Sequence, residues 1–307
     1  MGVRLAEEWF AICGGCEVTI LDIGEPLIDV LAKLDIVHMP VLMDHKLYGQ
    51  TGEDAEMSIP EADVGMITGG IRTEEHKKIA QEMRKKCKTL IAMGSCACFG
   101  GVPALANLYS TEELTDKVYR GSVTTDHDGI PGTGIPALTD RIYAVKEAVP
   151  VDLSLPGCPT TPEMVAGALT ALLEGKPFDM PTKSVCDDCP TIREKKAVST
   201  LKRRLDAPEF TPGRPLAEMR CLMEQGILCL GPATRTGCGG SQGTPRCIRA
   251  YMPCEGCFGP ISDAANPMVD MMGALSTIGL DPKQIPDRAP TFNRFVGAGR
   301  LRPLPRR

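Results

Sequence analysis

The residues of this sequence with the clearest chemical potential are its 14 cysteines. In a chain that stays inside a cell, thiols are kept reduced, so disulfide bonds are a poor explanation for so many of them. Several lie in short motifs with glycine or proline, and such spacing is typical of metal ligands. The first half of the chain holds the motifs CGGC at 13–16, GSC at 94–96 and PGCP at 156–159. We therefore expect metal binding.

Each of these three motifs follows a segment that is predicted to be a β-strand. The expected strands are 3–12, 36–43, 63–68, 89–93 and 151–155. In an open α/β sheet, ligands bind at the carboxyl ends of the strands. We therefore expect four thiols to converge there, those of Cys13, Cys16, Cys96 and Cys158. Four converging thiolates favour zinc or an iron–sulfur cluster. Cys98 could take the place of Cys96, but Cys96 is favoured because it directly follows Gly-Ser at the strand end.

The order of the expected elements indicates an α/β fold. Helices are predicted at 16–34, with a kink or restart at Pro26, and at 73–86 and 161–174. Short apolar strands that alternate with helices predict a doubly wound parallel sheet. Segment 107–140 breaks this rhythm, and its glycine and proline residues predict a long surface loop with a turn at 126–129.

The chain changes character after Gly175, so we expect a first domain over residues 1–178 and a second over 179–307. Proline, glycine and cysteine dominate the second part, where helices are predicted only at 216–225 and 268–278. Its cysteines divide into two groups of four. One group is Cys186, Cys189, Cys221 and Cys229, and the other is Cys238, Cys247, Cys254 and Cys257. Bound ligands, more than apolar burial, should hold this part together.

Two four-cysteine zinc sites would fit this spacing as well as two iron–sulfur clusters do. However, prolines follow Cys189 and precede Cys254, as is common in ferredoxin-type ligand runs. Three cluster sites in succession would form an electron path, whereas three structural zinc sites on an already large α/β domain would be redundant. The residues alone therefore favour iron–sulfur clusters, and they leave Cys87 and Cys98 without a ligand role.

The composition excludes several other classes of protein. With 39 acidic and 34 basic residues and a net charge of -5, the chain has no broad basic surface for nucleic acid or anionic membranes. No apolar run approaches the roughly 18 residues of a membrane span. The first residues show neither a secretory stretch nor a twin-arginine pair, so we expect a cytoplasmic protein. Glu17, directly after Cys16, could relay protons or, more simply, form an ion pair at a surface or interface.

The motifs CGGCE at 13–17, GSCACFGG at 94–101 and PGCP at 156–159 resemble the proximal-cluster motifs of [NiFe]-hydrogenase small subunits. The run from Cys221 to Cys257 is similar to the C-terminal cluster domain of that family. The resemblance covers nearly the whole chain. It is strongest toward the cytoplasmic, methyl-viologen-reducing hydrogenases of methanogens, which do not reduce the deazaflavin coenzyme.

This resemblance implies a flavodoxin-like first domain and three [4Fe–4S] clusters. The implied ligands are Cys13, Cys16, Cys96 and Cys158 for the proximal cluster, Cys186, Cys189, Cys221 and Cys229 for the distal cluster, and Cys238, Cys247, Cys254 and Cys257 for the medial cluster. It implies no catalytic residue on this chain, because the nickel–iron centre belongs to the partner large subunit. Electrons would leave through a subunit with a [2Fe–2S] cluster and feed a heterodisulfide reductase in methanogenesis.

Two positions depart from the pattern of many exported relatives. Cys186 stands where those relatives have histidine, and Cys247 stands where their proline leaves a [3Fe–4S] medial cluster, so a fourth iron is expected here. Three alternatives remain open: the small subunit of a deazaflavin-reducing hydrogenase, a zinc-stabilised interaction module, and a quinone-linked subunit of the respiratory complex I type. Subunits of the last type typically carry adjacent cysteines after the first strand and lack the two further clusters.

Overall fold

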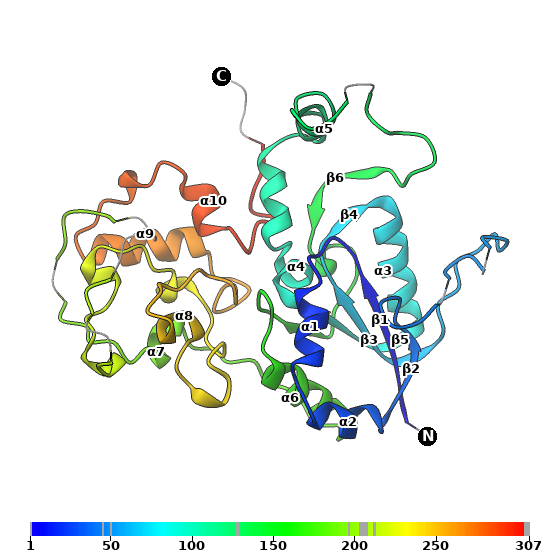
Figure 1. Ribbon diagram of the computed structural model, residues 1–307, viewed down its shortest axis with the longest axis horizontal. Coiled ribbons are helices and arrows are strands. Elements are labelled where there is room, and N and C mark those ends of the chain that lie inside the picture. Colours follow the sequence, from blue (N-terminus) through cyan, green and yellow to red (C-terminus); the bar gives the residue numbers. More distant parts are fainter. Residues whose placement is uncertain are drawn as a thin grey trace.

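The computed structural model describes residues 2–44, 46–49, 51–126, 129–195, 197–202, 208–210 and 213–303. Its first part is built on a five-stranded parallel sheet (Figure 1). The strands lie in the order β2 (Leu34–His38), β1 (Val3–Trp9), β3 (Ala62–Thr68), β5 (Cys87–Met93) and β7 (Leu153–Leu155). The order reverses between β1 and β3, which makes the sheet doubly wound. The predicted α/β fold is confirmed.

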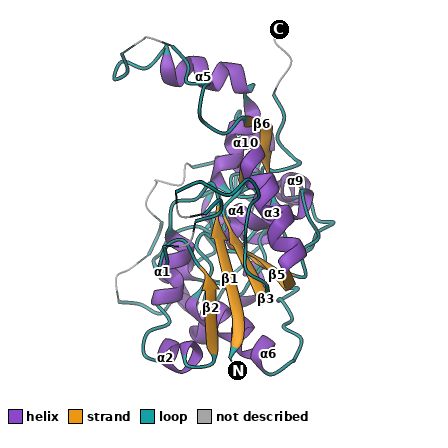
Figure 2. Cartoon of the chain, turned by 90° about the vertical axis from the view of Figure 1, so that its right-hand side faces the viewer, coloured by secondary structure: helices purple, strands orange, loops and turns teal. Residues whose placement is uncertain are grey.

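Helices cover both faces of this sheet, because parallel strands are buried on both sides. The helices on one face are α1 (Gly15–Leu21), α2 (Pro26–Leu31) and α6 (Pro162–Leu173), and those on the other are α3 (Glu74–Lys86) and α4 (Gly94–Phe99). Both views show α1 and α3 on opposite sides of the sheet (Figures 1 and 2). Successive strand residues alternate between the two apolar layers, with Met66 and Ile91 in the layer of α6 and Ile67 and Leu90 in the layer of α3.

Local sequence explains where the longer helices begin. At the start of α3 the hydroxyl of Thr73 accepts a hydrogen bond from the backbone N–H of His76 at 3.1 Å. Thr161 caps α6 in the same way, and Pro162 occupies its first turn. Both caps satisfy backbone donors that a helix end leaves free, which fixes the helices at the positions that the sequence predicts.

Several expected elements of the first part are shorter than predicted, including the first strand, which ends at Trp9, and the last strand, which spans Leu153–Leu155. The helix expected at 16–34 is the pair α1 and α2, because Gly24 takes a left-handed conformation (φ 75°) and Pro26 starts a new helix. The strand expected at 36–43 ends at His38. Beyond it the backbone turns, since the N–H groups of Leu42 and Met43 both bond to the carbonyl of Met39.

The prediction of one long loop at 107–140 is wrong at both ends. Residues 111–119 form helix α5 (Thr111–Tyr119), whose first turn has a capping box between Ser110 and Glu113. Near the other end, β6 (Leu138–Tyr143) pairs antiparallel with β4 (Ile71–Thr73). The run rich in glycine and proline between them obscured both elements, although Ser110 and Glu113 have the spacing of a capping box, which is a helix-start signature in sequence.

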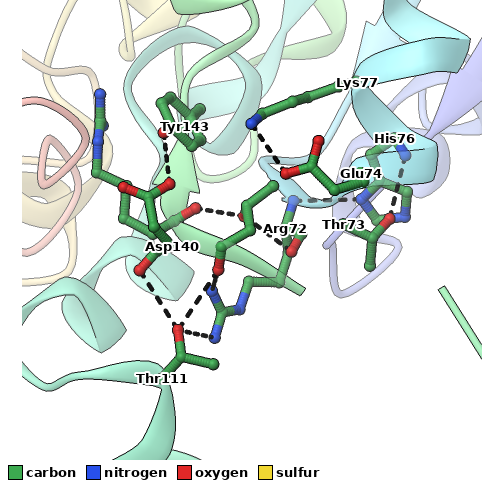
Figure 3. A network of polar contacts seen from close by, with 10 residues as sticks. Arg72, Thr73, Glu74, His76, Lys77, Thr111, Asp140 and Tyr143 are labelled. Atoms are coloured by element: carbon green, nitrogen blue, oxygen red, sulfur yellow. Dashed lines mark hydrogen bonds and ion pairs between the residues drawn. The ribbon is translucent and has the colours of Figure 1, made fainter. Parts of the chain in front are cut away.

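A polar network holds α5 against this antiparallel pair of strands (Figure 3). The guanidinium of Arg72 donates to the carbonyl of Thr139 at 2.7 Å and to the hydroxyl of Thr111 at 3.4 Å. The hydroxyl of Tyr143 donates to Asp140 at 2.5 Å. Because Arg72 reaches residues of both α5 and β6, it replaces the apolar contacts that these short elements lack.

The second part of the chain lies beside the sheet, beyond α4, and consists of short helices and turns (Figure 1). Its elements are α7 (Val185–Asp188), α8 (Arg246–Arg249), α9 (Pro267–Thr277) and α10 (Arg288–Phe292), with 3₁₀ turns at Leu216–Glu218, Met223–Gln225, Gly231–Ala233, Gly240–Gln242 and Pro282–Gln284. Two further 3₁₀ turns, Val102–Leu108 and Val145–Glu147, belong to the first part. The helix predicted at 268–278 corresponds to α9.

The helix predicted at 216–225 is two separate 3₁₀ turns. The backbone between them pairs with a remote segment instead: the N–H of Ile192 bonds to the carbonyl of Met219 at 2.9 Å, and the N–H of Cys221 bonds to the carbonyl of Ile192 at 2.7 Å. These bonds use groups that a continuous helix would need. The second part also has an apolar cluster of its own, which includes Met271 and Phe292, so burial contributes more here than predicted.

The described residues contain no helix that is long and apolar enough to cross a membrane. The predicted turn at 126–129 includes His127 and Asp128, which lie outside the described residues. His45 and the last four residues of the chain, 304–307, lie outside them as well.

Candidate functional site

The first group of predicted ligands meets at the carboxyl ends of β1, β5 and β7. Cys13 and Cys16 flank the start of α1, Cys96 lies in α4, and Cys158 follows β7. Burial raises the pKa of the Cys16 thiol, and the thiols of Cys96 and Cys158 raise it further. Burial also raises the pKa of Cys96 to about 12, with contributions from Cys158 and Cys13. The structure thus brings these four thiols within electrostatic range of one another.

Glycine residues lie against the sulfur atoms of this first thiol group. Gly94 has a φ of +83°, and a Cβ added to it would lie 2.3 Å from the sulfur of Cys16. Gly101 has a φ of +58°, and its added Cβ would lie 2.4 Å from the sulfur of Cys96. No side chain fits at either position, so the thiols lie directly against main chain, where N–H groups can donate to sulfur.

The two remaining cysteines of the first part point elsewhere. The thiol of Cys98 is buried and donates to the carbonyl of Ala92 at 3.2 Å, within β5. Cys87 is buried in the apolar layer under α3. This geometry favours Cys96 over Cys98 as the ligand.

The second group comprises four thiols around α7. Burial raises the pKa of Cys186 to about 12; Arg193 lowers it, and the thiols of Cys221 and Cys189 raise it. Burial raises the pKa of Cys229 to about 12 as well, and Cys186 and Cys221 contribute. The wall of this site is again glycine: a Cβ on Gly231 would lie 3.1 Å from the sulfur of Cys186 and 3.6 Å from that of Cys229.

A loop held by a buried carboxylate borders this second group. Arg193 donates from its guanidinium to the carbonyl of Cys186. Glu224, which is buried, accepts the backbone N–H groups of Glu194 and Lys195 at 2.7 and 2.8 Å. Neither role is visible in the sequence, because an Arg-Glu-Lys run at 193–195 is typical of an ordinary solvated surface.

The third group contains Cys238, Cys247, Cys254 and Cys257. Burial raises the pKa of Cys257 to about 12, and the thiols of Cys247 and Cys238 raise it further. Burial also raises the pKa of Cys254 well above its usual value; Cys229 of the second group is the thiol that raises it most, and Cys257 contributes less. Cys238, Cys247 and Cys257 thus act on one another, and Cys254 links them to the second group.

The third group lies between the other two. On one side, the backbone of Cys158 lies close enough to the thiol of Cys257 to lower its pKa, against the larger opposite effect of burial. On the other side, the backbone N–H of Cys254 donates to the sulfur of Cys229 at 3.2 Å. The order in space is thus first, third and second group, with direct contact at each junction.

A pair of buried carboxyl groups lies next to Cys16. The hydroxyl of Thr68 donates to Glu17 at 2.6 Å and lies 3.4 Å from Glu7. Burial raises the pKa of Glu7 to about 8, and Glu17 raises it too. Among the described residues, one oxygen of each carboxyl has no hydrogen-bond partner. Glu17 is therefore largely buried and forms no surface ion pair with the described residues, whereas the suggested ion pair at an interface stays a prediction.

The donor chemistry of the three groups fits iron–sulfur clusters. All 14 cysteines are free of disulfide bonds. Each group offers four soft thiol ligands, and glycine lines the first and second. Within the described part of the chain, no three His, Cys, Asp or Glu side chains lie close enough together to hold a single metal ion.

Comparison with known proteins agrees with this arrangement. Residues 13–172 match the protein family described as "NADH ubiquinone oxidoreductase, 20 Kd subunit". A subunit of the F420-non-reducing hydrogenase of Methanocaldococcus jannaschii is 40% identical over 92% of this chain and 91% of its own. A solved NAD+-reducing [NiFe]-hydrogenase chain is 29% identical, with a TM-score of 0.53, over 59% of this chain and 96% of that one. An H2-activated [NiFeSe]-hydrogenase of Dm. baculatum shares the fold over 86% of this chain and 96% of its own, at 17% identity and a TM-score of 0.52.

The sheet, the thiol-lined strand ends and these similarities together define a small subunit of a [NiFe]-hydrogenase, an oxidoreductase acting on hydrogen. Within this class, the chain belongs to the family of small subunits of F420-non-reducing hydrogenases. The expected resemblance is confirmed, and among the hydrogenase alternatives the F420-non-reducing type is the one supported. A small subunit works with a large subunit, so a partner chain is part of the functional enzyme.

Proposed function

We propose that this chain carries electrons through three [4Fe–4S] clusters between the nickel–iron centre of its large subunit and an acceptor protein. The proposed ligands are Cys13, Cys16, Cys96 and Cys158 for the proximal cluster, Cys238, Cys247, Cys254 and Cys257 for the medial cluster, and Cys186, Cys189, Cys221 and Cys229 for the distal cluster. The observation that carries this proposal is the row of three four-thiol groups with direct contacts at both junctions. The clusters, when bound, supply one-electron carriers at successive points along the row.

Each group includes buried thiols that must lose their protons to bind metal. Burial raises the pKa of Cys16, Cys186 and Cys257, so these thiols are protonated in the absence of a bound ion. Binding of iron must therefore release protons, and its free energy also stabilises the fold around it. Cys247 supplies a fourth thiol to the medial group, which supports four irons there and not three.

The first part of the chain is the side that meets the large subunit. One solved hydrogenase chain aligns over 96% of its own length but matches only 59% of this chain. A hydrogenase subunit can therefore lack a counterpart of the remaining residues. The family match likewise ends at residue 172. We propose a division at 178/179, with the proximal domain facing the nickel–iron subunit and residues 179–307 extending the relay toward the acceptor.

An apolar groove beside the proximal thiols is suited to the large subunit. It has a volume of about 250 Å³, is lined by α1, α2 and the turn after β2, and includes Gly14 and Glu17 next to the proximal thiols. Val18, Leu21 and Leu42 at its rim are 54%, 62% and 64% exposed in this chain alone. Cys13 and Cys158 are exposed as well. A contiguous apolar face around exposed ligands is typical of a surface that a permanent partner covers.

Further along the path, we propose an acceptor subunit with a [2Fe–2S] cluster that feeds a heterodisulfide reductase in methanogenesis, in the cytoplasm. The similarity to F420-non-reducing hydrogenase subunits of methanogens supports this assignment. The proximal and medial groups separate the distal thiols from the groove, so the acceptor would bind near Arg193 and α7.

Metal analysis tests the proposal. Iron, acid-labile sulfide and zinc are measured per chain in the anaerobically purified complex. About twelve irons and twelve sulfides on this chain are expected for three four-iron clusters. Two or three zinc ions without sulfide, about one per four-cysteine site, would instead establish the zinc-stabilised module.

A further inference from the structure

One buried hydroxyl joins the proximal and medial cysteine loops. Ser95, which is 1% exposed, lies between β5 and Cys96. Its hydroxyl accepts a hydrogen bond from the backbone N–H of Gly157 at 3.0 Å and donates to the carbonyl of Cys257. Its own backbone N–H donates to the carbonyl of Gly157 at 2.7 Å. A single side chain thus uses both its donor and its acceptor on two loops remote in sequence.

These two loops belong to different thiol groups. Gly157 directly precedes Cys158, a proposed proximal ligand, while Cys257 is a proposed medial ligand. Ser95 itself directly precedes Cys96, the other proximal ligand on this side. The hydroxyl therefore lies at the junction where the two groups are in contact, and its hydrogen bonds fix the position of one loop against the other.

The surrounding packing makes this junction rigid. Phe258, next to Cys257, is 2% exposed and packs in the apolar layer of the sheet that also includes Met93 and Leu155. A Cβ on Gly259 would lie 2.3 Å from the ring of Phe99 in α4, so the medial loop lies directly against that helix. Buried hydrogen bonds of this kind are directional and favour a single arrangement of the segments that they join.

We propose that Ser95 is a positioning residue that sets the gap between the proximal and medial clusters, and through it the rate at which electrons cross. The inference rests on the proposed function, because it requires clusters at both groups. The step itself moves one electron: the reduced proximal cluster is oxidised, the medial cluster is reduced, and no proton or bond is exchanged. The electrons come from hydrogen through the large subunit.

The test compares Ser95→Ala with Ser95→Thr in the anaerobically purified hydrogenase complex. Ser95→Ala removes the hydroxyl, whereas Ser95→Thr keeps it. Ser154→Ala is the matched control: this serine lies in β7, four residues before Cys158, and its hydroxyl bonds to Cys98 outside the three thiol groups. Iron and sulfide are measured first, then the magnetic interaction between the reduced proximal and medial clusters by EPR, and the rate of hydrogen-dependent dye reduction.

In Ser95→Ala we expect the full iron content, a loss or clear change of the proximal–medial magnetic splitting, and slower dye reduction. Ser95→Thr and Ser154→Ala should behave as the unmodified protein. An unchanged splitting in Ser95→Ala would overturn the proposal. Loss of the proximal or medial iron in that variant would overturn it too, because Ser95 would then be needed for cluster insertion and not for the gap. If the unmodified complex contains no clusters at all, the proposed function fails first, and the iron measurement reveals this before any variant is compared.

Discussion

Gly94→Ala should remove the proximal cluster while leaving the other two. The residue has a φ of +83°, and the added Cβ would lie 2.3 Å from the sulfur of Cys16. A left-handed conformation costs a non-glycine residue about 1–2 kcal/mol, and forcing an atom into a packed site adds about 1–3 kcal/mol. The total is about 2–5 kcal/mol, and its packing part can be relieved only if the Cys16 thiol moves away from the other ligands. A cluster that needs four converging thiols cannot tolerate that movement.

Gly24→Ala separates the two contributions. Gly24 has a φ of +75°, but an added Cβ would meet nothing within 4 Å, so this variant carries the backbone strain alone. Iron per chain and EPR of the reduced complex are the measurements. Gly94→Ala should lose about four of about twelve irons, and Gly24→Ala should lose none. Full iron content in both variants would refute the placement of the Cys16 thiol against Gly94, and with it the geometry of the proximal group.

Three further outcomes are expected. Cys247→Pro should convert one [4Fe–4S] cluster to [3Fe–4S], and an EPR spectrum without a three-iron signal would contradict the medial assignment. The folded-state pKa of Glu7 is raised from 4.5 to about 8, so its neutral form stabilises the fold at low pH and this stability is lost as pH rises through that window. Glu7→Gln should therefore flatten the fall in unfolding temperature between about pH 4.5 and about pH 8, while Glu61→Gln on the exposed surface should leave it unchanged. Val18→Asp places a charge in the apolar groove and should abolish co-purification of the nickel-bearing subunit, whereas Val123→Asp, at a fully exposed position, should not. Retention of nickel by Val18→Asp would exclude this groove as the interface.

The fold of the first part could be predicted because its signals are local. Apolar strands ending in Gly-Cys or Pro-Gly-Cys motifs give both the sheet and the edge at which thiols gather. Thr73 and Thr161 mark their helices through side-chain caps that sequence reveals directly. Helix α5 and strand β6 were missed because they flank a run rich in glycine and proline, and because the contacts of Arg72 that hold them join segments remote in sequence.

The division of the later cysteines into two groups of four stays a prediction from their spacing, and the contacts of these cysteines with other segments could not be predicted. Spacing indicates which thiols lie near each other along the chain. It says nothing about the contact between Cys254 and Cys229, or about the hydroxyl of Ser95 reaching Cys257, because these contacts join segments that only tertiary packing brings together. The buried carboxyl of Glu7 escaped notice for the same reason: a glutamate inside a strand reads as exposed until its neighbours are known.

The loop from Cys254 to Cys257 explains how a short segment can connect two remote thiol groups. Its first cysteine donates a backbone N–H to the sulfur of Cys229, and the thiol of its last lies close to the backbone of Cys158. The loop must turn sharply to face both ways, and Gly256, with a φ of +91° and an added Cβ 3.1 Å from Leu230, provides that turn. The medial group is thus the structural joint between the two parts of the chain as well as the middle of the proposed relay. A change that shifts this loop should therefore alter both neighbouring gaps at once, whereas a change at Ser95 alters only the gap on the proximal side.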